Sequence, residues 1–269
     1  MVSKYRWLKY VPNSLTLCNS LCGFGAILFA LNVFRPNFNP PQVLTICAWI
    51  ILCAMVFDAL DGFAARIFNA ASMHGMQMDS LADMVTFGVA PAFLSVVMAQ
   101  CLLQMTMTQT VITLLLASTY LGCAALRLAT YNVHAILEKK SGDKFTGLPS
   151  PGAAAAICSL IMFYSINYQY IKDFEWVKYL AMLVPVYAAI LGLLMVSNVP
   201  YTHVGKWLQS VRRNRYRMTL LAIILVIAGI FGIKGIVIII NFYIFSGPII
   251  VLLNKLNLLP KKTLPQPQS

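Results

Sequence analysis

The sequence contains few charged residues and very few acidic ones. Only 10% of its 269 residues are Asp, Glu, Lys or Arg, and Asp and Glu together number 8. A soluble domain would not combine so little charge with repeated apolar runs near the roughly 20 residues that cross a bilayer. The composition is 59% hydrophobic with a mean hydropathy of +0.76, which excludes an ordinary soluble protein and indicates a polytopic membrane protein.

Other features are missing, and each absence excludes a class of protein. The 7 cysteines form no C-x-x-C pair and all lie in apolar segments, so neither disulfides nor zinc are indicated. No internal repeat is evident, and the first apolar run lacks a small-residue cleavage site, so we expect it to remain as a membrane span. The net charge of +12 fits a positive-inside bias and attraction to anionic membrane lipids, and we expect no nucleic-acid partner.

The apolar runs predict an all-α fold. We expect a polytopic membrane helical bundle of about eight transmembrane helices, preceded by a short N-terminal interfacial helix. The expected spans are 13–34, 42–60, 79–104, 108–130, 151–168, 178–198, 218–234 and 236–254. The last two could be full spans joined by a tight turn at Lys234–Gly235, or a re-entrant pair broken there.

The chain divides into membrane segments without a boundary between separate globular domains. The segments are an amphipathic juxtamembrane segment (1–12), a core of six spans (13–217), a two-helix membrane segment (218–257) and a tail expected to be disordered (258–269). If the N-terminus is cytoplasmic, the only basic residues outside are Arg35, Lys172, Lys178 and Lys234. Basic residues stay on the cytoplasmic side, so both termini are expected there.

Half of the acidic residues fall in one short stretch, between Asp58 and Asp83. Asp58 and Asp61 are three residues apart, and Asp79 and Asp83 are four apart, so on helices each pair projects from one face. Arg66 is the only basic residue in the stretch and cannot neutralise four carboxylates. Because hard divalent cations take oxygen ligands of this kind, the sequence predicts two helices facing each other across a metal site at the cytoplasmic ends of the second and third spans.

Nearby residues suit a phosphate group. Gly62 leaves backbone exposed for a close approach, and Arg66 lies about one turn further on, placed for bidentate contacts. Gly75 would permit a sharp turn or a close contact before the second helix. The segment Pro12–Thr16 either caps the first span or contacts a substrate. These parts suit in-line phosphoryl transfer with two cations, in which one carboxylate accepts the proton of the attacking hydroxyl.

The spacing Asp58-x2-Asp61-Gly62-x2-Ala65-Arg66-x8-Gly75-x3-Asp79-x3-Asp83 resembles the complete signature of the CDP-alcohol phosphatidyltransferases. This resemblance implies that the four Asp residues hold two divalent cations, Mg²⁺ or Mn²⁺, and that Asp83 is also the general base. It implies a homodimer and a set of contacts to the lipid donor, CDP-diacylglycerol. Those contact residues are Pro12, Asn13, Asp58, Gly62, Ala65, Arg66 and Ser72.

Five further stretches resemble bacterial integral-membrane members of this family that use L-serine as the acceptor. They are Pro12–Ile27, Asp79–Ala92, Ala125–Val133, Phe145–Ala155 and Leu193–Tyr201. One departure is Thr130–Tyr131, where Arg-Phe is expected. The resemblance implies an enzyme of the bacterial inner membrane, with its site at the cytoplasmic face, that makes phosphatidylserine and releases CMP.

Recognition of the serine carboxylate needs a cation. Arg127 is the nearest candidate, with Asn132 beside it. Arg127 could equally be a structural arginine at a helix end.

Two alternatives to serine transfer stay open. One is the same chemistry with glycerol 3-phosphate or inositol phosphate, which should need a compact cluster of cations. The other is an ion-coupled transporter, which the missing repeat and the one-sided acids disfavour.

Overall fold

The computed structural model describes residues 11–68, 72–102, 105–137, 147–171, 176–199, 201 and 215–256. Over these ranges the regular elements are helical and no strand occurs, which confirms the predicted all-α class. The helices are α1 (Val11–Ala30), η2 (Leu31–Phe34), α2 (Pro40–Ile67), α3 (Met73–Asp83), the π-helix η3 (Met84–Val89), α4 (Ala90–Leu102), α5 (Met107–Leu137), α6 (Ser150–Ile171), α7 (Trp176–Val196) and α9 (Arg215–Lys255).

Six helical stretches are long and apolar enough to cross a membrane. They are Val11–Phe34, Pro40–Ile67, Met73–Cys101, Met107–Val133, Ser150–Tyr168 and Ile230–Leu253. A shorter apolar stretch, Met182–Val196 in α7, corresponds to the expected sixth span. The apolar stretch in α9 begins at Ile230, and the side chains of 215–229 lie outside the described part of the chain, so most of the expected span 218–234 stays a prediction. The third span begins at Met73, earlier than predicted, because α3, η3 and α4 follow one another without a break.

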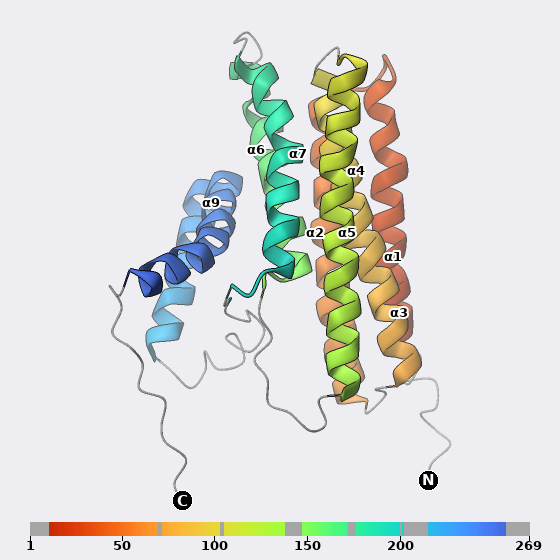
Figure 1. Ribbon diagram of the computed structural model, residues 1–269, viewed down its shortest axis with the longest axis vertical. Coiled ribbons are helices and arrows are strands. Elements are labelled where there is room, and N and C mark those ends of the chain that lie inside the picture. Colours follow the sequence, from red (N-terminus) through yellow and green to blue (C-terminus); the bar gives the residue numbers. More distant parts are fainter. Residues whose placement is uncertain are drawn as a thin grey trace, which may run out of the picture.

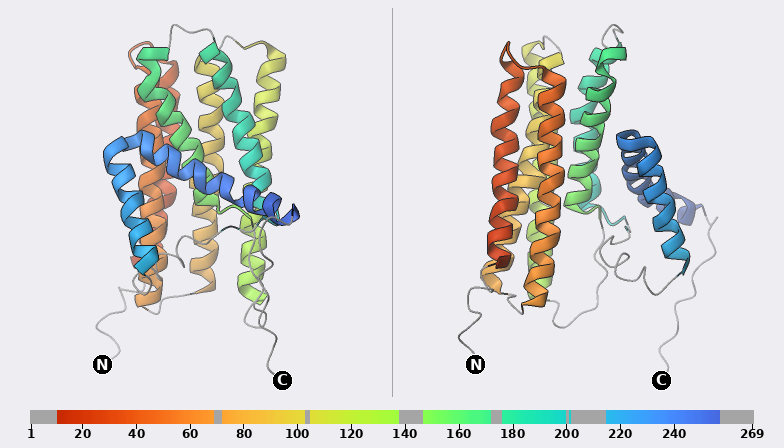
Figure 2. Two further views of the ribbon diagram at one scale, coloured as in Figure 1. Left: turned by 90° about the vertical axis from the view of Figure 1, so that its left-hand side faces the viewer. Right: turned by 180° about the vertical axis from the view of Figure 1, so that it is seen from behind.

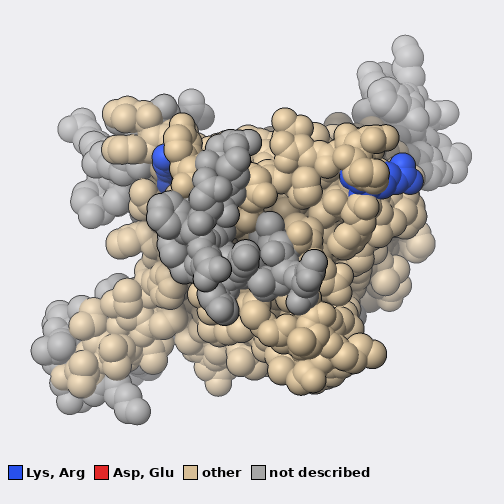
Figure 3. Space-filling view, turned by 90° about the horizontal axis from the view of Figure 1, so that it is seen from above, with Lys and Arg blue, Asp and Glu red and all other residues tan. Residues whose placement is uncertain are grey.

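The first five membrane-length helical stretches form an upright bundle with α7, and α1 begins at the lower end of this bundle (Figure 1). The N-terminal end of α1, the C-terminal end of α2 and the N-terminal end of α3 meet at that lower end. Viewed from above, the surface that the structure describes at the other end shows little Lys or Arg and no Asp or Glu (Figure 3).

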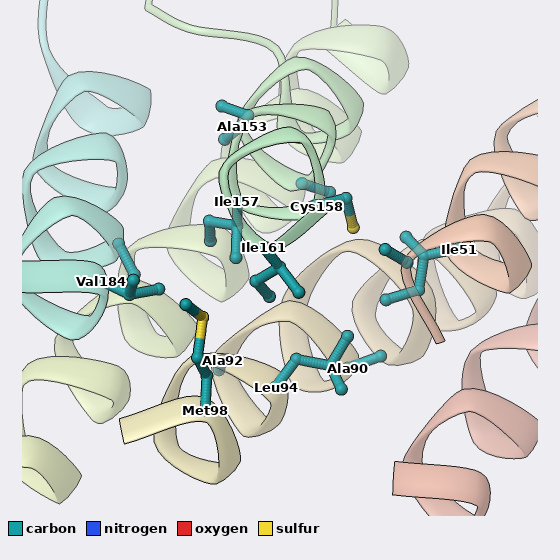
Figure 4. Packing of buried hydrophobic residues seen from close by; sticks show 14 of the residues in the cluster. Ile51, Ala90, Ala92, Leu94, Met98, Ala153, Ile157, Cys158, Ile161 and Val184 are labelled. Carbon is teal, nitrogen blue, oxygen red and sulfur yellow. The ribbon is translucent and has the colours of Figure 1, made fainter. Parts of the chain in front are cut away.

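Small side chains allow the central helices to pack closely. On α6, Ala153, Ile157 and Ile161 are fully buried, and Ile161 lies toward Leu94 and Met98 of α4 (Figure 4). Small residues at helix interfaces let membrane helices approach each other, so that dispersion contacts become dense. This core holds α3 and α4 as one fixed element between α1, α5 and α6.

The C-terminal helix α9 folds back on itself. Its backbone breaks at Gly232, where φ is 54° and ψ is −131°, a conformation that glycine adopts without a side-chain penalty. The bend is therefore two residues before the Lys234–Gly235 position expected from the sequence. Figure 2 shows the two arms of α9 beside the bundle, with the bend well below the upper ends of α6 and α7.

The second arm of α9 is attached to the bundle by specific contacts. The Tyr187 hydroxyl donates to Asn241 Oδ1 at 2.6 Å, and the Tyr201 hydroxyl donates to the Ile244 carbonyl at 3.0 Å. Gly247 lies against the Tyr201 ring so closely that a Cβ there would be 2.6 Å from Cζ. These contacts fix the arm against α7 and Tyr201.

Some sequence-based expectations lie outside the described residues. They are most of the interfacial segment 1–12, the basic loops within 138–146 and 202–214, and the tail 258–269. Val11 and Pro12 are described, and they form the start of α1.

Candidate active site

Carboxylates from α2 and α3 meet near the lower end of the bundle. Asp58 and Asp61 lie on the last turns of α2, and Asp79 lies on α3. Each of these three side chains offers an oxygen, and the three oxygens lie within 4.8 Å of one another. The two helices thus face each other through their acidic side chains, in the arrangement that the residue spacing predicts.

Asp83 borders this group of three without belonging to it. Its carboxyl group is within hydrogen-bonding reach of Asp58, and its Oδ1 accepts a hydrogen bond from Asn19 Nδ2 at 3.2 Å. Asp83 is also the last residue of α3, immediately before the π-helix η3. It therefore stands at the inner edge of the acidic cluster, which we define as Asp58, Asp61, Asp79 and Asp83.

Helix α1 supplies neutral hydrogen-bond donors to this cluster. Thr16 Oγ1 donates to Asp61 Oδ2 at 2.7 Å and also lies 3.0 Å from the Pro12 carbonyl. Asn19 lies three residues further on, so both side chains project from one face of α1. Sequence analysis included Thr16 in the segment Pro12–Thr16 without connecting it to Asp61, and it missed Asn19. The available signal was a pair of polar side chains, three residues apart, in a helix that also carries Asn13, Ser14 and Ser20.

A close contact one turn beyond Asn19 holds α1 against η3. Gly23 packs on Thr86 so tightly that a Cβ would lie 2.6 Å from Thr86 Oγ1 and 2.7 Å from Thr86 Cα. The Thr86 hydroxyl donates to the Asn19 carbonyl at 2.9 Å. Because Thr86 follows Asp83 by three residues, this contact sets the distance between Asn19 and Asp83.

The cluster fits a hard divalent cation. Its donors are carboxylate oxygens, the ligands that Mg²⁺ and Mn²⁺ prefer. Asp79 Oδ1 is buried and has no hydrogen-bond partner in the structure, although a buried polar atom normally has one. The hydrogen bonds described above come from a hydroxyl and an amide, which leave the negative charge uncompensated.

Gly62 and Arg66 form an open edge beside the cluster. Gly62 is exposed, and a Cβ built there would meet nothing within 4 Å. Arg66 is exposed, and its Nε donates to the Gly62 carbonyl at 3.0 Å. Ala65, between them on α2, is half-buried. This edge has room for a group as large as a phosphate.

The start of α3 lies next to the start of α1. Ser72 caps α3, because its Oγ accepts a hydrogen bond from the Gly75 amide at 3.0 Å. Gly75 therefore lies in the first turn of α3 and not in a turn before it. A Cβ at Gly75 would be 3.2 Å from Ser72 Oγ and 3.5 Å from Asn13 Oδ1, so the close-contact interpretation of this glycine fits the structure. Pro12 is buried one residue away.

The two expected serine-binding residues occupy different surroundings. Asn132 Oδ1 accepts a hydrogen bond from Ser80 at 2.9 Å, which places it beside α3 next to Asp79. Arg127 is buried, and its Nη1 donates to the Met195 carbonyl at 2.9 Å. Gly147, with φ of +89°, lies against the same guanidinium group. Arg127 thus joins α5 to the end of α7, whereas Asn132 faces the acidic helix.

Comparisons with known proteins agree with this arrangement. The family model described as CDP-alcohol phosphatidyltransferase matches residues 9–195. A Bacillus subtilis (strain 168) protein named CDP-diacylglycerol--serine O-phosphatidyltransferase is 32% identical over 203 residues, which cover 74% of this chain and 93% of that protein. A protein of the same name from Helicobacter pylori (strain 26695) is 28% identical over 199 residues, 74% of each chain. One from Saccharomyces cerevisiae is 33% identical over 156 residues, 56% of this chain and 53% of that one.

Proposed function

Because the chain belongs to the CDP-alcohol phosphatidyltransferase family, a family of phosphotransferases, we propose that it is a phosphatidylserine synthase. It transfers the phosphatidyl group of CDP-diacylglycerol to the hydroxyl of L-serine and releases CMP. The observation that carries this proposal is the acidic cluster, in which α2 and α3 bring the carboxylates of the family signature together. The names of the similar proteins support serine as the acceptor.

Asp58, Asp61, Asp79 and Asp83 would hold two divalent cations, either Mg²⁺ or Mn²⁺. When bound, such ions neutralise phosphate oxygens and stabilise the charge of the leaving group. Thr16 orients Asp61, which restricts the directions in which its oxygens point. The unpartnered Oδ1 of Asp79 supports this assignment.

Asp83 is proposed as the general base. Its carboxylate takes the proton of the serine hydroxyl while the hydroxyl oxygen forms a bond to the phosphorus that carries diacylglycerol. The bond between that phosphorus and the bridging oxygen breaks, and CMP leaves. Asn19 holds one oxygen of Asp83, which orients the carboxylate for the proton transfer.

The CDP part of the donor would lie along the lower ends of α1, α2 and α3. Gly62 and Arg66 offer an open edge and a guanidinium group for the phosphates, with Ala65 and Asp58 bordering them. Asn13 and Ser72 lie close to Gly75, and together with Pro12, the neighbour of Asn13 on α1, they would provide the second set of contacts. Binding both substrates beside one set of carboxylates supplies the proximity that a two-substrate transfer needs.

Serine is expected to bind toward α5. Asn132 is close enough to α3 to contact an acceptor beside Asp79. Arg127 is the proposed partner of the serine carboxylate, although its bond to Met195 also gives it a structural task. Arg127→Ala should raise the KM for serine much more than the KM for CDP-diacylglycerol, whereas equal changes would assign it the structural task alone.

The rival acceptors, glycerol 3-phosphate and inositol phosphate, carry a second phosphate group. A phosphate acceptor favours several basic side chains that converge on one point. In the part of the chain that the structure describes, Arg66 lies at the exposed end of α2 and Arg127 is buried against α7. These two side chains do not converge on one point. This arrangement favours serine, which carries no phosphate group.

We also propose that the enzyme lies in a bacterial inner membrane with both termini and the acidic cluster on the cytoplasmic side. The six apolar helices and the distribution of Lys and Arg support this placement. Anionic lipids would attract the basic segments, and a homodimer is expected from the family resemblance.

The test is CMP release by the purified protein in detergent, with CDP-diacylglycerol and either Mg²⁺ or Mn²⁺. L-Serine, glycerol 3-phosphate, inositol and inositol phosphate are offered in parallel. Release that needs both the metal and serine is the expected result. Release with another alcohol would keep the reaction class and overturn the acceptor, and no release with any of them would overturn the proposed function.

A further inference from the structure

We propose that Asn19 determines acceptor specificity: its amide carbonyl accepts a hydrogen bond from the ammonium group of an amino alcohol whose hydroxyl lies at Asp83. This inference rests on the proposed function and adds a residue that the family signature does not include. Asn19 lies on α1, one helical turn before the glycine that contacts η3.

Asn19 is held in place from two sides. Its side chain is fully buried, its Nδ2 donates to Asp83 Oδ1 at 3.2 Å, and its backbone carbonyl accepts from Thr86 at 2.9 Å. The close approach of Gly23 to Thr86 leaves α1 little freedom to move away. Asn19 is therefore fixed beside Asp83 before any substrate arrives.

The orientation of the Asn19 amide follows from its partner. A carboxylate only accepts hydrogen bonds, so the NH₂ end must face Asp83 and the carbonyl end must face elsewhere. That carbonyl oxygen, Oδ1, is buried and has no hydrogen-bond partner in the structure. A buried acceptor of this kind requires a donor, and its position next to Asp83 indicates that the donor belongs to a molecule bound at the acidic cluster.

The chemistry of an amino alcohol matches these two neighbouring groups. In L-serine the hydroxyl and the ammonium group are on adjacent carbon atoms, so a hydroxyl at Asp83 places the ammonium group within a few bonds of it. An ammonium group is a charged donor, and charged hydrogen bonds are stronger than neutral ones. Asn19 would thus bind the ammonium group while Asp83 receives the hydroxyl proton.

The experiment pairs a change in the enzyme with a change in the substrate. L-Serine is compared with 3-hydroxypropanoate, which keeps the hydroxyl and the carboxylate and lacks the amine. Both are assayed in detergent by CMP release, and 3-hydroxypropanoate is also measured as an inhibitor of serine turnover, so that a slow reaction still gives a binding constant. The wild-type protein should prefer serine by about 10- to 100-fold, the range of one charged hydrogen bond.

Two variants separate the two ends of the Asn19 amide. Asn19→Leu keeps the branched arrangement of side-chain heavy atoms and removes both the donor and the acceptor, so the preference for serine should fall to near one. Asn19→Asp keeps an acceptor oxygen and loses the donor to Asp83, so turnover should fall for both compounds while the preference for serine persists. Leu21→Ala, on the exposed side of α1, serves as the control and should behave like the wild type.

The outcomes distinguish this inference from the proposed function. If Asn19→Leu lowered CMP release equally with both compounds and kept the preference for serine, the role of Asn19 would be limited to orienting Asp83. That result would overturn the inference. A change only in the Mn²⁺ concentration needed for activity would make Oδ1 a cation ligand and also overturn it. Wild-type CMP release that is faster with an alcohol lacking an amine than with serine, or the absence of CMP release with every alcohol, would remove the proposed function and this inference together.

Discussion

Substitution of Gly23 by alanine tests the contact between α1 and η3 on which the site geometry depends. A Cβ at this position would lie 2.7 Å from Thr86 Cα, and ordinary contact begins near 3.4 Å, so the two backbones would have to separate by about 0.7 Å. Because one of the colliding atoms is backbone, a side-chain rotation cannot relieve the clash. The separation would pull Asn19 away from Asp83 and Thr16 away from Asp61.

The expected magnitude follows from these distances. Overpacking of this kind costs about 1–3 kcal/mol of stability. A misplacement near 1 Å at a catalytic group can lower the rate by about 100-fold. We expect Gly23→Ala to fold with a reduced melting temperature and to release CMP at roughly one hundredth of the wild-type rate, with a smaller change in either KM.

Gly25→Ala is the matched control. It lies two residues away on the same helix, and a Cβ there meets nothing within 4 Å. Both variants gain the same helix propensity, up to about 1 kcal/mol, so their difference isolates the clash. The assays are CMP release and thermal unfolding in detergent. If Gly23→Ala matched Gly25→Ala in both, the tight contact with Thr86 would have no role in positioning the acidic cluster.

Three further predictions address other contacts. Thr16→Val should raise the Mn²⁺ concentration for half-maximal CMP release by about 10- to 100-fold, because Asp61 loses its orienting donor, whereas Thr45→Val, which breaks a bond to the Pro41 carbonyl, should not. Asp83→Asn should abolish CMP release without changing the unfolding profile, and substantial turnover would exclude it as the base. Tyr187→Phe should lower the melting temperature by about 2–4 °C at unchanged turnover, because it removes only a hydrogen bond to Asn241; a loss of turnover would instead link the second arm of α9 to catalysis.

Sequence reasoning reached the acidic pairs because their spacing is a property of one helix. Asp58 and Asp61 must share a face of α2 whatever the rest of the chain does, and the same holds for Asp79 and Asp83 on α3. Thr16 and Asn19 could not be found in this way, since their role depends on which helix packs against the cluster. That packing depends on a tertiary contact between Gly23 and Thr86.

The differences in the fold have similar causes. The bend of α9 is at Gly232 because the backbone there takes a positive φ, whereas the sequence offers a second glycine at 235, next to a lysine, as an equally plausible break. Gly75 is inside α3 because Ser72, a good N-cap residue, starts the helix earlier than the apolar pattern indicates. Both outcomes follow from local backbone geometry that hydropathy does not encode.

The π-helix η3 gives the gene one place where the chain can lose a residue without turning the acidic helix. It joins Asp83 to Ala90 through a wider turn, which holds one residue more than an α-turn would. If one codon between 84 and 89 were lost, the segment could close into an ordinary α-helix with little rotation of α3 against α4, because six residues in wide turns cover about the same angle as five residues at about 100° each. The same loss inside α4 has no wide turn to absorb it and would rotate the residues on its two sides by about 100°. In this gene, an in-frame deletion of three bases should therefore be better tolerated within 84–89 than within 90–102.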